Sequence, residues 1–328
     1  MLPADVLLIL FSLIGADAAR ATETLRLRAV CGQWRALLDA AGQETLGPAL
    51  AKRGRWLASA AELAKAARLG PAWPWRARGR TPLMGALTTG DAPTLHTLNL
   101  EDCRTLSSTE ALPNIAALRE LRLTWCRALV DIAPLRSARA LHTLSLAGCE
   151  KLTSVEALAD ALALHTLDLQ CCTGLTSVEA LGTLPALHTV KLSKCSRLTS
   201  VAALGRAPAL HTLSLQSCEM LNSIDGLGSA PALHTLDLME CTGLTSVDAL
   251  ATALVLHTLK LACCIRLTNV DALARAPNLH ELSMVGCRRL RSVGALANSP
   301  ALQALDVSFC FNLTDTETLR GVIKHVFT

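Results

Sequence analysis

Apolar and polar positions alternate in one short phrase that recurs every 23 residues through the last two-thirds of the chain. With Leu95 as position 1, the unit reads L-x-x-L-x-L-x-x-C-x-x-L-T-S-V-x-A-L, followed by a short tail that often carries Ala-Pro. Ten units begin at Leu95, Leu118, Leu141, Leu164, Leu187, Leu210, Leu233, Leu256, Leu279 and Leu302. A fixed period of this length is the signature of a solenoid, in which each repeat contacts only its neighbours. The function of such a chain is expected to lie in a surface rather than in a catalytic pocket.

The phrase predicts a short strand and a short helical turn in every unit. Leu at positions 4 and 6 follows the two-residue period of a strand with one buried face, so positions 3, 5 and 7 are predicted to point outward. Leu, Val and Leu at positions 12, 15 and 18 recur every three residues, which suits a 3₁₀ or short α turn. Thr153 with Glu156, and Thr176 with Glu179, have the spacing of a capping box at the start of that turn. Strands stacked 4.8 Å apart would form a parallel sheet about 45 Å long.

The leucine phrase resembles the leucine-rich repeat, whose landmark is L-x-x-L-x-L-x-x-N/C. The resemblance covers about 230 residues. It implies an α/β solenoid of horseshoe form, with a parallel sheet on the concave side and short 3₁₀ or α turns on the convex side. We therefore divide the chain into a helical head at 1–45, a helical linker with a degenerate leading repeat at 46–94, and ten repeats with a C-terminal cap at 95–328.

Cysteine occupies position 9 of every unit without a slip in register. The ten residues are Cys103, Cys126, Cys149, Cys172, Cys195, Cys218, Cys241, Cys264, Cys287 and Cys310. A buried thiol is small and is a weak donor, so it can fill the bend after the strand and bond a carbonyl. Disulfides between neighbouring thiols are the alternative. Zinc is disfavoured because the cysteines are evenly spaced rather than paired as C-x-x-C.

Composition and charge exclude several function classes. The chain is 51% hydrophobic but has only five Trp, four Phe and no Tyr, so its core must be aliphatic. Residues 1–90 carry twelve Lys/Arg against six Asp/Glu, and residues 91–328 carry nineteen against twenty-one. A nearly neutral repeat array offers no footprint for nucleic acid. No apolar stretch is long enough to span a membrane, and no constellation of catalytic or cofactor-binding residues stands out, so we expect a protein that is not an enzyme and needs no cofactor.

The first forty residues contain two apolar-faced helical patterns. Leu2-Pro3 opens the first, with apolar residues at Val6, Leu10, Phe11 and Ile14, and the second contains Val30, Cys31, Trp34 and Arg35. These residues resemble the F-box, whose opening Leu-Pro, first-helix apolar positions and Val-Cys-x-x-Trp-Arg they match in that order. The resemblance implies that Leu2, Pro3, Val6, Leu10, Phe11, Ile14, Val30, Cys31 and Trp34 contact a Skp-type adaptor of a cullin-RING ubiquitin ligase.

Two other interpretations of this head remain open. The apolar run from Val6 to Ile14 is followed by Ala-Asp-Ala, which is typical of a secretory signal peptide, but an acid stands where a basic residue is expected before the run. The head is otherwise an ordinary helical cap on the solenoid. The F-box interpretation places the protein in the cytoplasm or nucleus, where reduced thiols are the rule.

Residues that break the small-polar pattern of the outward positions are the candidates for partner binding. Trp125, Met239 and Phe309 would be exposed apolar groups, and exposed aromatics are the usual anchors of interfaces. Trp125, with Arg119 and Arg122 nearby, is the first choice, whereas Phe309 and Phe311 could instead cover the open end of the array. Position 5 cycles through Ser, Asp and Lys every three units. This cycle predicts cross-strand ion pairs of about 0.2–1 kcal/mol between Asp168 and Lys191 and between Asp237 and Lys260.

Histidine occupies position 2 in eight of the ten units, at His96, His142, His165, His188, His211, His234, His257 and His280. A row of metal-binding imidazoles is conceivable, but no carboxylate or thiol joins the row at ligand spacing. We predict a structural stack. Neighbouring imidazolium groups repel and lose hydration, which lowers their pKa in the folded state. The stability of the chain should therefore fall as the pH drops below about 6.5.

The sequence thus predicts a protein-recognition module, and the F-box resemblance implies a substrate receptor that brings an unknown target protein to a ligase. A plain interaction scaffold and a secreted recognition protein are the alternatives.

Overall fold

The computed structural model describes residues 56–57, 75–78, 96–104, 106–110, 118–319 and 321–328. The chain divides into two units, Met1–Arg55 and Trp56–Thr328. The F-box-like segment and its nine adaptor-contact residues lie outside the described residues, so their assignment stays a prediction.

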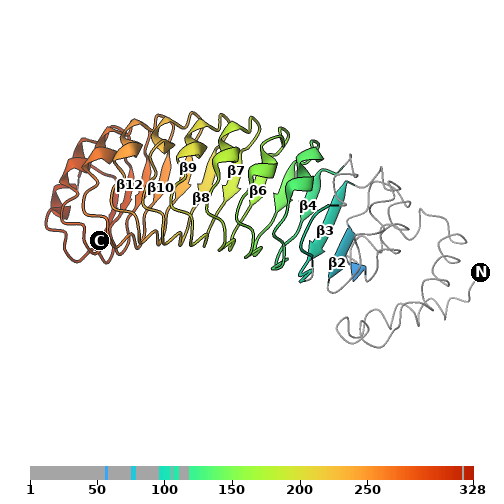
Figure 1. Ribbon diagram of the computed structural model, residues 1–328. Helices are drawn as coiled ribbons and strands as arrows, with labels where there is room; N and C mark the ends of the chain where they lie inside the picture. The colour runs from blue at the N-terminus through green and yellow to red at the C-terminus, as the bar shows by residue number, and fades with distance from the viewer. Residues whose placement is uncertain (1–55, 58–74, 79–95, 105, 111–117, 320) are drawn as a thin grey trace, which may run out of the picture. The chain divides into compact units, whose positions relative to one another are not determined.

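The second unit is a solenoid built on one parallel sheet. Among the described residues, thirteen strands follow one another in chain order, each hydrogen-bonded to the next in parallel (Figure 1). The strands are β1 (Trp56–Leu57), β2 (Trp75–Arg78), β3 (Thr97–Glu101), β4 (Glu120–Arg122), β5 (Thr143–Ser145), β6 (Thr166–Asp168), β7 (Thr189–Lys191), β8 (Thr212–Ser214), β9 (Thr235–Asp237), β10 (Thr258–Lys260), β11 (Glu281–Ser283), β12 (Ala304–Asp306) and β13 (His325–Phe327). Trp75 of β2 lies opposite Leu98 of β3, one repeat length along the chain.

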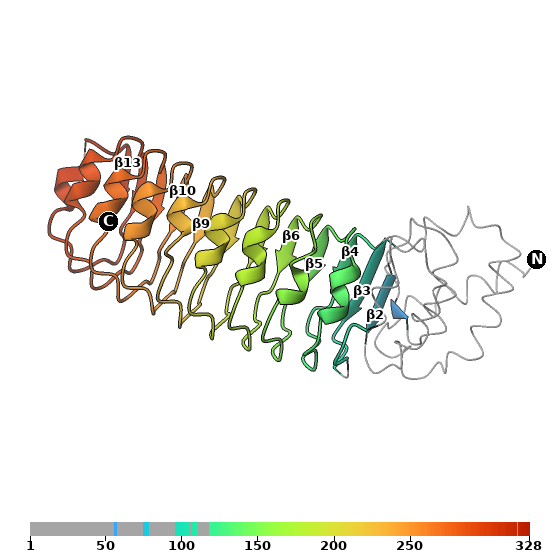
Figure 2. The same cartoon turned by 45° about the horizontal axis from the view of Figure 1, so that its top comes forward.

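Short 3₁₀ helices form a second row beside the sheet, one in each repeat from Leu118 to Leu302 among the described residues (Figure 2). They are η2 (Ala133–Ser137), η3 (Glu156–Leu158), η4 (Glu179–Thr183), η5 (Ala202–Arg206), η6 (Leu227–Ser229), η7 (Asp248–Thr252), η8 (Asp271–Arg275), η9 (Gly294–Asn298) and η10 (Thr316–Leu319). The predicted helical turn is present but shorter than the span of positions 12 to 18. In η5, Leu204 at position 18 lies within the helix, Val201 at position 15 is its N-cap and Leu198 at position 12 precedes it.

The core is a stack of identical aliphatic layers between the two rows. In the repeat at 210–232, Leu213, Leu215 and Cys218 are fully buried, and so are Leu221 and Leu227. Neighbouring layers meet in register, since Leu213 of β8 pairs with Val190 on one side and Leu236 on the other. The predicted alternation is confirmed at position 3, which is half-buried or exposed wherever position 4 is buried. Most residues of positions 5 and 7 are also half-buried or exposed, but Asn99, Ser193, Asp237 and Ala262 are buried.

The turn into each 3₁₀ helix is made differently from the capping box that the sequence suggested. The N-cap residues Val155 and Val178 receive no side-chain hydrogen bond. Instead Ser154 Oγ accepts a hydrogen bond from the backbone N–H of Glu156 at 3.2 Å, and Ser177 does the same for Glu179. The capping-box prediction is therefore wrong. The short hydroxyl at position 14 reaches the N–H two residues on, a local turn that Ser favours.

The residue before each ladder cysteine adopts a left-handed backbone, which the repeat pattern does not predict. Position 8 has a φ between 55° and 76° from Asp102 to Phe309, and eight of these ten residues are not glycine. That conformation costs about 1–2 kcal/mol for a residue with a Cβ. It persists because the N–H of position 8 donates to the position 7 carbonyl of the next repeat, as from Trp125 to Ala147 at 2.7 Å.

The C-terminal segment closes the last layer. Leu319 of η10 is fully buried, Ile323 is nearly so, and β13 extends the sheet beyond β12. Phe309 and Phe311 are 65% and 78% exposed, so they do not cover the end of the core.

Candidate functional site

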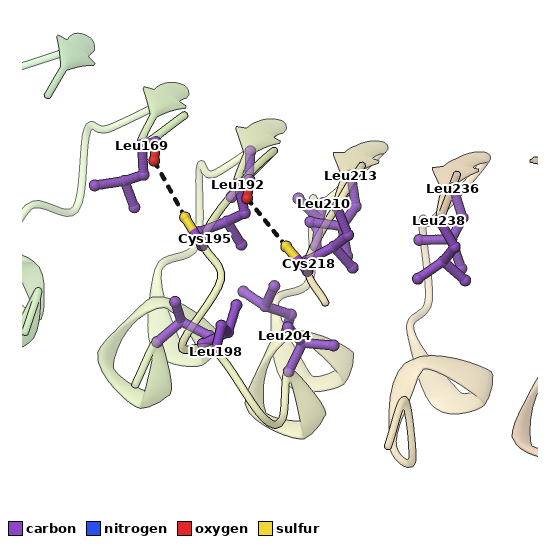
Figure 3. Close-up of a cluster of buried hydrophobic side chains, with 14 of the residues drawn as sticks. Leu169, Leu192, Cys195, Leu198, Leu204, Leu210, Leu213, Cys218, Leu236 and Leu238 are labelled. Atoms are coloured by element: carbon purple, nitrogen blue, oxygen red, sulfur yellow. Dashed lines mark hydrogen bonds between the residues drawn. The ribbon is translucent and has the colours of Figure 1, made fainter. Parts of the chain in front are cut away.

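The cysteine ladder is defined as the ten position 9 thiols, and from Cys126 onward each thiol links its repeat to the one before it. Cys195 Sγ donates to the carbonyl of Leu169 at 3.2 Å, and Cys218 Sγ donates to that of Leu192 at 3.2 Å (Figure 3). The same bond recurs from Cys126 to Cys310 at 3.0–3.3 Å. The described cysteines are free thiols. The predicted structural role is confirmed, and the ladder forms no disulfide.

Burial makes these thiols poor nucleophiles. It raises the pKa of Cys149 and of Cys241 to about 12 and that of Cys218 to about 11. A thiol with so high a pKa stays protonated at neutral pH, so it remains a hydrogen-bond donor and offers no thiolate to a metal or an electrophile. The cysteine ladder therefore stabilises the fold and is not itself a catalytic or metal-binding site.

The histidine ladder, defined as the seven position 2 imidazoles from His142 to His280, forms a continuous stack. The centroids of neighbouring rings lie 4.3–4.9 Å apart, and from His165 onward the ring planes are within 6–9° of parallel. Nδ1 of His188 lies 3.3 Å from the hydroxyl of Thr189, a contact that the neighbouring repeats share. The predicted structural stack is confirmed.

This geometry does not suit a metal. A metal ion about 2.1 Å from a ring nitrogen must lie in the ring plane, along the lone pair. Stacked parallel rings direct their lone pairs side by side instead of toward a common point. Among the residues that the structure describes, no group of three or more His, Cys, Asp or Glu could hold a metal ion.

The Asp and Lys residues of position 5 are paired in register but not as ions. Asp168 lies opposite Lys191, and Asp237 opposite Lys260. Each carboxylate instead accepts a hydrogen bond from the backbone two residues on, Asp168 from Gln170 and Asp237 from Met239, both at 3.1 Å. Gln216 Nε2 also donates to Asp237 at 2.6 Å. None of the ion pairs between described residues joins these partners.

The predicted ion pairs at position 5 are therefore wrong. A fixed backbone N–H next to the carboxylate holds it without ordering a long lysine side chain, which explains the preference. Lys191 and Lys260 stay exposed and Asp237 is 7% exposed, so this row offers a partner mainly lysine ammonium groups. Met239 is half-buried beside the row.

Trp125 is an exposed aromatic candidate whose indole packs on the next repeat. It occupies the left-handed position 8 of its repeat, with φ 61°, and remains 40% exposed. Its indole covers Gly148, the position 8 residue of the next repeat, where a Cβ would lie only 2.3 Å from the ring. Only glycine fits beneath the indole, so the position of the Trp125 side chain depends on Gly148. Gly148 was not among the predicted site residues. The sequence feature that could have identified it is a glycine at position 8, where most repeats have another residue.

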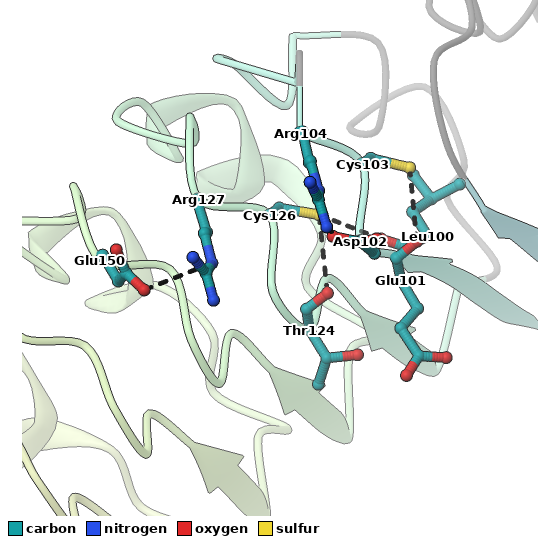
Figure 4. Close-up of polar contacts among 9 residues, drawn as sticks. All are labelled: Leu100, Glu101, Asp102, Cys103, Arg104, Thr124, Cys126, Arg127 and Glu150. Carbon is teal, nitrogen blue, oxygen red and sulfur yellow. Dashed lines mark hydrogen bonds and ion pairs between the residues drawn. The ribbon is translucent and has the colours of Figure 1, made fainter.

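Charged pairs surround the Trp125 indole. Arg127 lies over the ring at 5.6 Å from the ring centre, and its guanidinium also meets Glu150 at 3.3 Å (Figure 4). Arg122 pairs with Glu120 at 2.6 Å on β4, and the side chain of Arg119 is exposed. Arg127 and Gly148 thus both lie close to the indole. Arg127 and Glu150 were not among the residues that the sequence singled out.

The remaining aromatic candidate lies at the other end of the repeats. Phe309 has the same left-handed conformation as Trp125, with φ 62°, and its ring meets that of Phe311 edge-on at 6.2 Å. Eight repeats separate Trp125 from Phe309, which corresponds to about 38 Å along the sheet. The structure therefore does not bring all the predicted partner-binding residues together but places them in separate regions.

Known structures share this architecture. An internalin (inlF) from Listeria monocytogenes superposes with a TM-score of 0.55 at 17% identity, covering 80% of this chain and 82% of that one. The leucine-rich repeat domain of the type III effector XopL superposes with a TM-score of 0.54 at 18% identity, covering 77% and 94%. The fold is the leucine-rich-repeat solenoid. That prediction is confirmed, and the likeness concerns the fold alone.

The chain matches no family model and no curated protein in sequence. Within the described residues, no helix is long and apolar enough to cross a membrane.

Proposed function

We propose that this leucine-rich-repeat protein binds another protein and performs no chemistry of its own. The observation that supports the proposal is Trp125, a large aromatic side chain that is 40% exposed yet packs on Gly148 with Arg127 over its ring. An aromatic that is already immobilised loses little entropy on binding, and such residues are the usual hot spots of interfaces. The flanking ion pairs of Arg122 and Arg127 would form the polar rim around this anchor.

Affinity capture with the full chain should show Trp125 to be the anchor. Trp125→Ala is expected to weaken binding of the principal captured protein by tenfold or more, since hot-spot truncations cost about 2 kcal/mol or more. Gly148→Ala should have a similar effect, because its Cβ would displace the indole. Leu162→Ala, which removes a side chain 58% exposed, is the matched control and should bind normally. Equal binding by Trp125→Ala and the control would exclude this surface.

The finer proposal is that the protein is the substrate receptor of a cullin-RING ubiquitin ligase, working in the cytoplasm or nucleus. It rests on the resemblance of Leu2-Pro3 and Val30-Cys31-x-x-Trp34-Arg35 to the F-box. A Skp-type adaptor would hold the N-terminal segment, and the repeats would hold the target. The receptor would supply proximity, which alone can accelerate a transfer reaction greatly.

Binding of a purified Skp-type adaptor to the full chain tests this role. We expect the wild type and Trp125→Ala to bind equally well, and the triple variant Leu2→Ala, Pro3→Ala, Trp34→Ala to lose binding. If the wild type does not bind the adaptor, the ligase role is excluded, while the target-binding role of the repeats would still stand. A scaffold without ligase function would then be the better description.

A further inference from the structure

A second exposed surface lies on the loops that follow β10, β11 and β12, and it includes several large apolar side chains. Phe309 is 65% exposed, Phe311 78% and Ile265 43%, and Cys263 is exposed beside them. Between Cys263 and Phe309 stands Gly286, whose missing side chain leaves only the Cys263 sulfur nearby, 3.4 Å from where a Cβ would lie. Gly286 itself is buried, so the exposed apolar groups of these three repeats are Cys263 and Phe309 at position 8 and Ile265 and Phe311 at position 10.

Arginines adjoin this patch without carboxylate partners. Arg288 occupies position 10 between Ile265 and Phe311, with Arg266 and Arg289 in the next row at position 11. All three side chains are exposed, as is that of Arg291. The ion pairs between described residues all lie between Asp102 and Arg206, and none includes these four arginines.

The charge of the neighbouring sequence reinforces the contrast. Residues 256–301 contain six Lys/Arg and two Asp/Glu, a balance of +4, whereas residues 141–255 contain five and ten, a balance of −5. The net charge of the repeats is therefore close to zero although one region, which contains most of the exposed apolar side chains described above, is basic. Exposed cations without partners next to exposed phenylalanines are a complementary surface for an acidic and apolar ligand.

We propose that Ile265, Arg288, Arg289, Phe309 and Phe311 form a docking surface for an acidic protein segment that carries apolar side chains. One apolar side chain of the segment rests on the exposed rings of Phe309 and Phe311. Its flanking carboxylates meet Arg288 and Arg289, since guanidinium groups bind carboxylates in bidentate pairs. This surface is separate from that of Trp125 and takes a ligand of different chemistry.

A protein segment fits this surface better than other polyanions do. Three repeats span about 10 Å, which matches three or four residues of extended chain but is small for a membrane surface. The rings of Phe309 and Phe311 meet at 71°, so they do not offer parallel faces for stacked bases. The acidic repeats next to the surface would also repel a long phosphate backbone.

Fluorescence anisotropy with the full chain tests the proposal. The probe is a fluorescein-labelled heptapeptide, Asp-Glu-Phe-Asp-Leu-Glu-Asp, compared with a copy whose acids are lysines and a copy whose Phe and Leu are serines. We expect only the first to bind. The double variant Arg288→Glu, Arg289→Glu and the variant Phe311→Ser should each weaken binding by tenfold or more.

Controls separate this result from the Trp125 site and from misfolding. Trp125→Ala should bind the acidic peptide as the wild type does. The altered residues are exposed, so far-ultraviolet circular dichroism should be unchanged in each variant. The proposal is overturned if no peptide binds, if the lysine or serine copy binds equally well, or if the double arginine variant binds unchanged. Tighter binding of a poly-dT oligonucleotide or of phosphatidylserine vesicles would also overturn it.

Discussion

Replacing Leu213 by alanine is expected to lower the free energy of unfolding by about 2–5 kcal/mol. Leu213 is fully buried in β8, near the middle of the array, and pairs with Val190 and Leu236 of its two neighbours. The stability of a solenoid is approximately the sum of repeat terms and nearest-neighbour interface terms. A cavity at Leu213 weakens one repeat and both of its interfaces, so the loss should fall at the upper end of this range.

Urea unfolding followed by circular dichroism provides the measurement. The matched control is Met220→Ala in the same repeat, whose side chain is 55% exposed and whose loss should change stability by about 0.5 kcal/mol or less. Uncoupling of the two halves of the array would appear as a second transition in Leu213→Ala only. A loss below 1 kcal/mol would mean that the leucine layers do not form the close-packed core described above.

Acidification from pH 7.5 to pH 5 is expected to destabilise the fold through the histidine ladder. Desolvation, followed by the charges of the neighbouring imidazoles, lowers the pKa of His165, His211 and His257. Glu281 opposes this effect at His257. A lowered pKa means that the unfolded chain binds protons more readily than the folded one. The ladder costs nothing above about pH 6.5, and its penalty grows as the pH falls from there through the folded-state pKa.

Thermal melts at the two pH values measure this effect. The triple variant His165→Gln, His211→Gln, His257→Gln should show a smaller difference in melting temperature between pH 7.5 and pH 5 than the wild type. His325→Gln, outside the ladder, is the control and should keep the full difference. If the wild-type melts coincide, the stacked imidazoles do not resist protonation and the prediction is wrong.

The carboxyl group of Asp315 does not contribute to the change in stability over this pH range. Burial opposes ionisation of Asp315, but hydrogen bonds from Ser292, Val293 and Gly294 outweigh it and lower the pKa of that carboxyl. Its contribution to stability is present above about pH 4 and is lost only as the pH falls through its lowered pKa. The contribution of Asp315 therefore does not change between pH 7.5 and pH 5.

The repeat pattern was sufficient to predict most of the fold. The leucine alternation identified the buried face of each strand, and the unbroken cysteines indicated the thiol ladder. The three-residue spacing of Leu198, Val201 and Leu204 indicated a 3₁₀ turn, although only Leu204 lies within it. These features follow from the local period together with the stacking of identical units. Both are written directly in the sequence of a one-dimensional array.

The candidate sites were predicted less well because they depend on contacts between neighbouring repeats. Asp168 and Lys191 are adjacent, as expected, yet the carboxylate bonds a backbone N–H that no sequence spacing reveals. The role of Gly148 is visible only in the structure, in which the Trp125 indole lies on it. Phe309 and Phe311 could equally have closed the core, and the structure instead gives that role to Leu319 and Ile323.

The sequence by itself determined that this chain is an aliphatic repeat array with thiols and imidazoles in rows, because periodic side chains on a periodic backbone must align. Only the tertiary structure decided which outward residues are held by neighbours and which remain available. Position 8 shows the physical reason: its left-handed backbone is imposed by a hydrogen bond to the next repeat and aims each side chain across that repeat. Which side chain is left exposed therefore depends on two repeats at once.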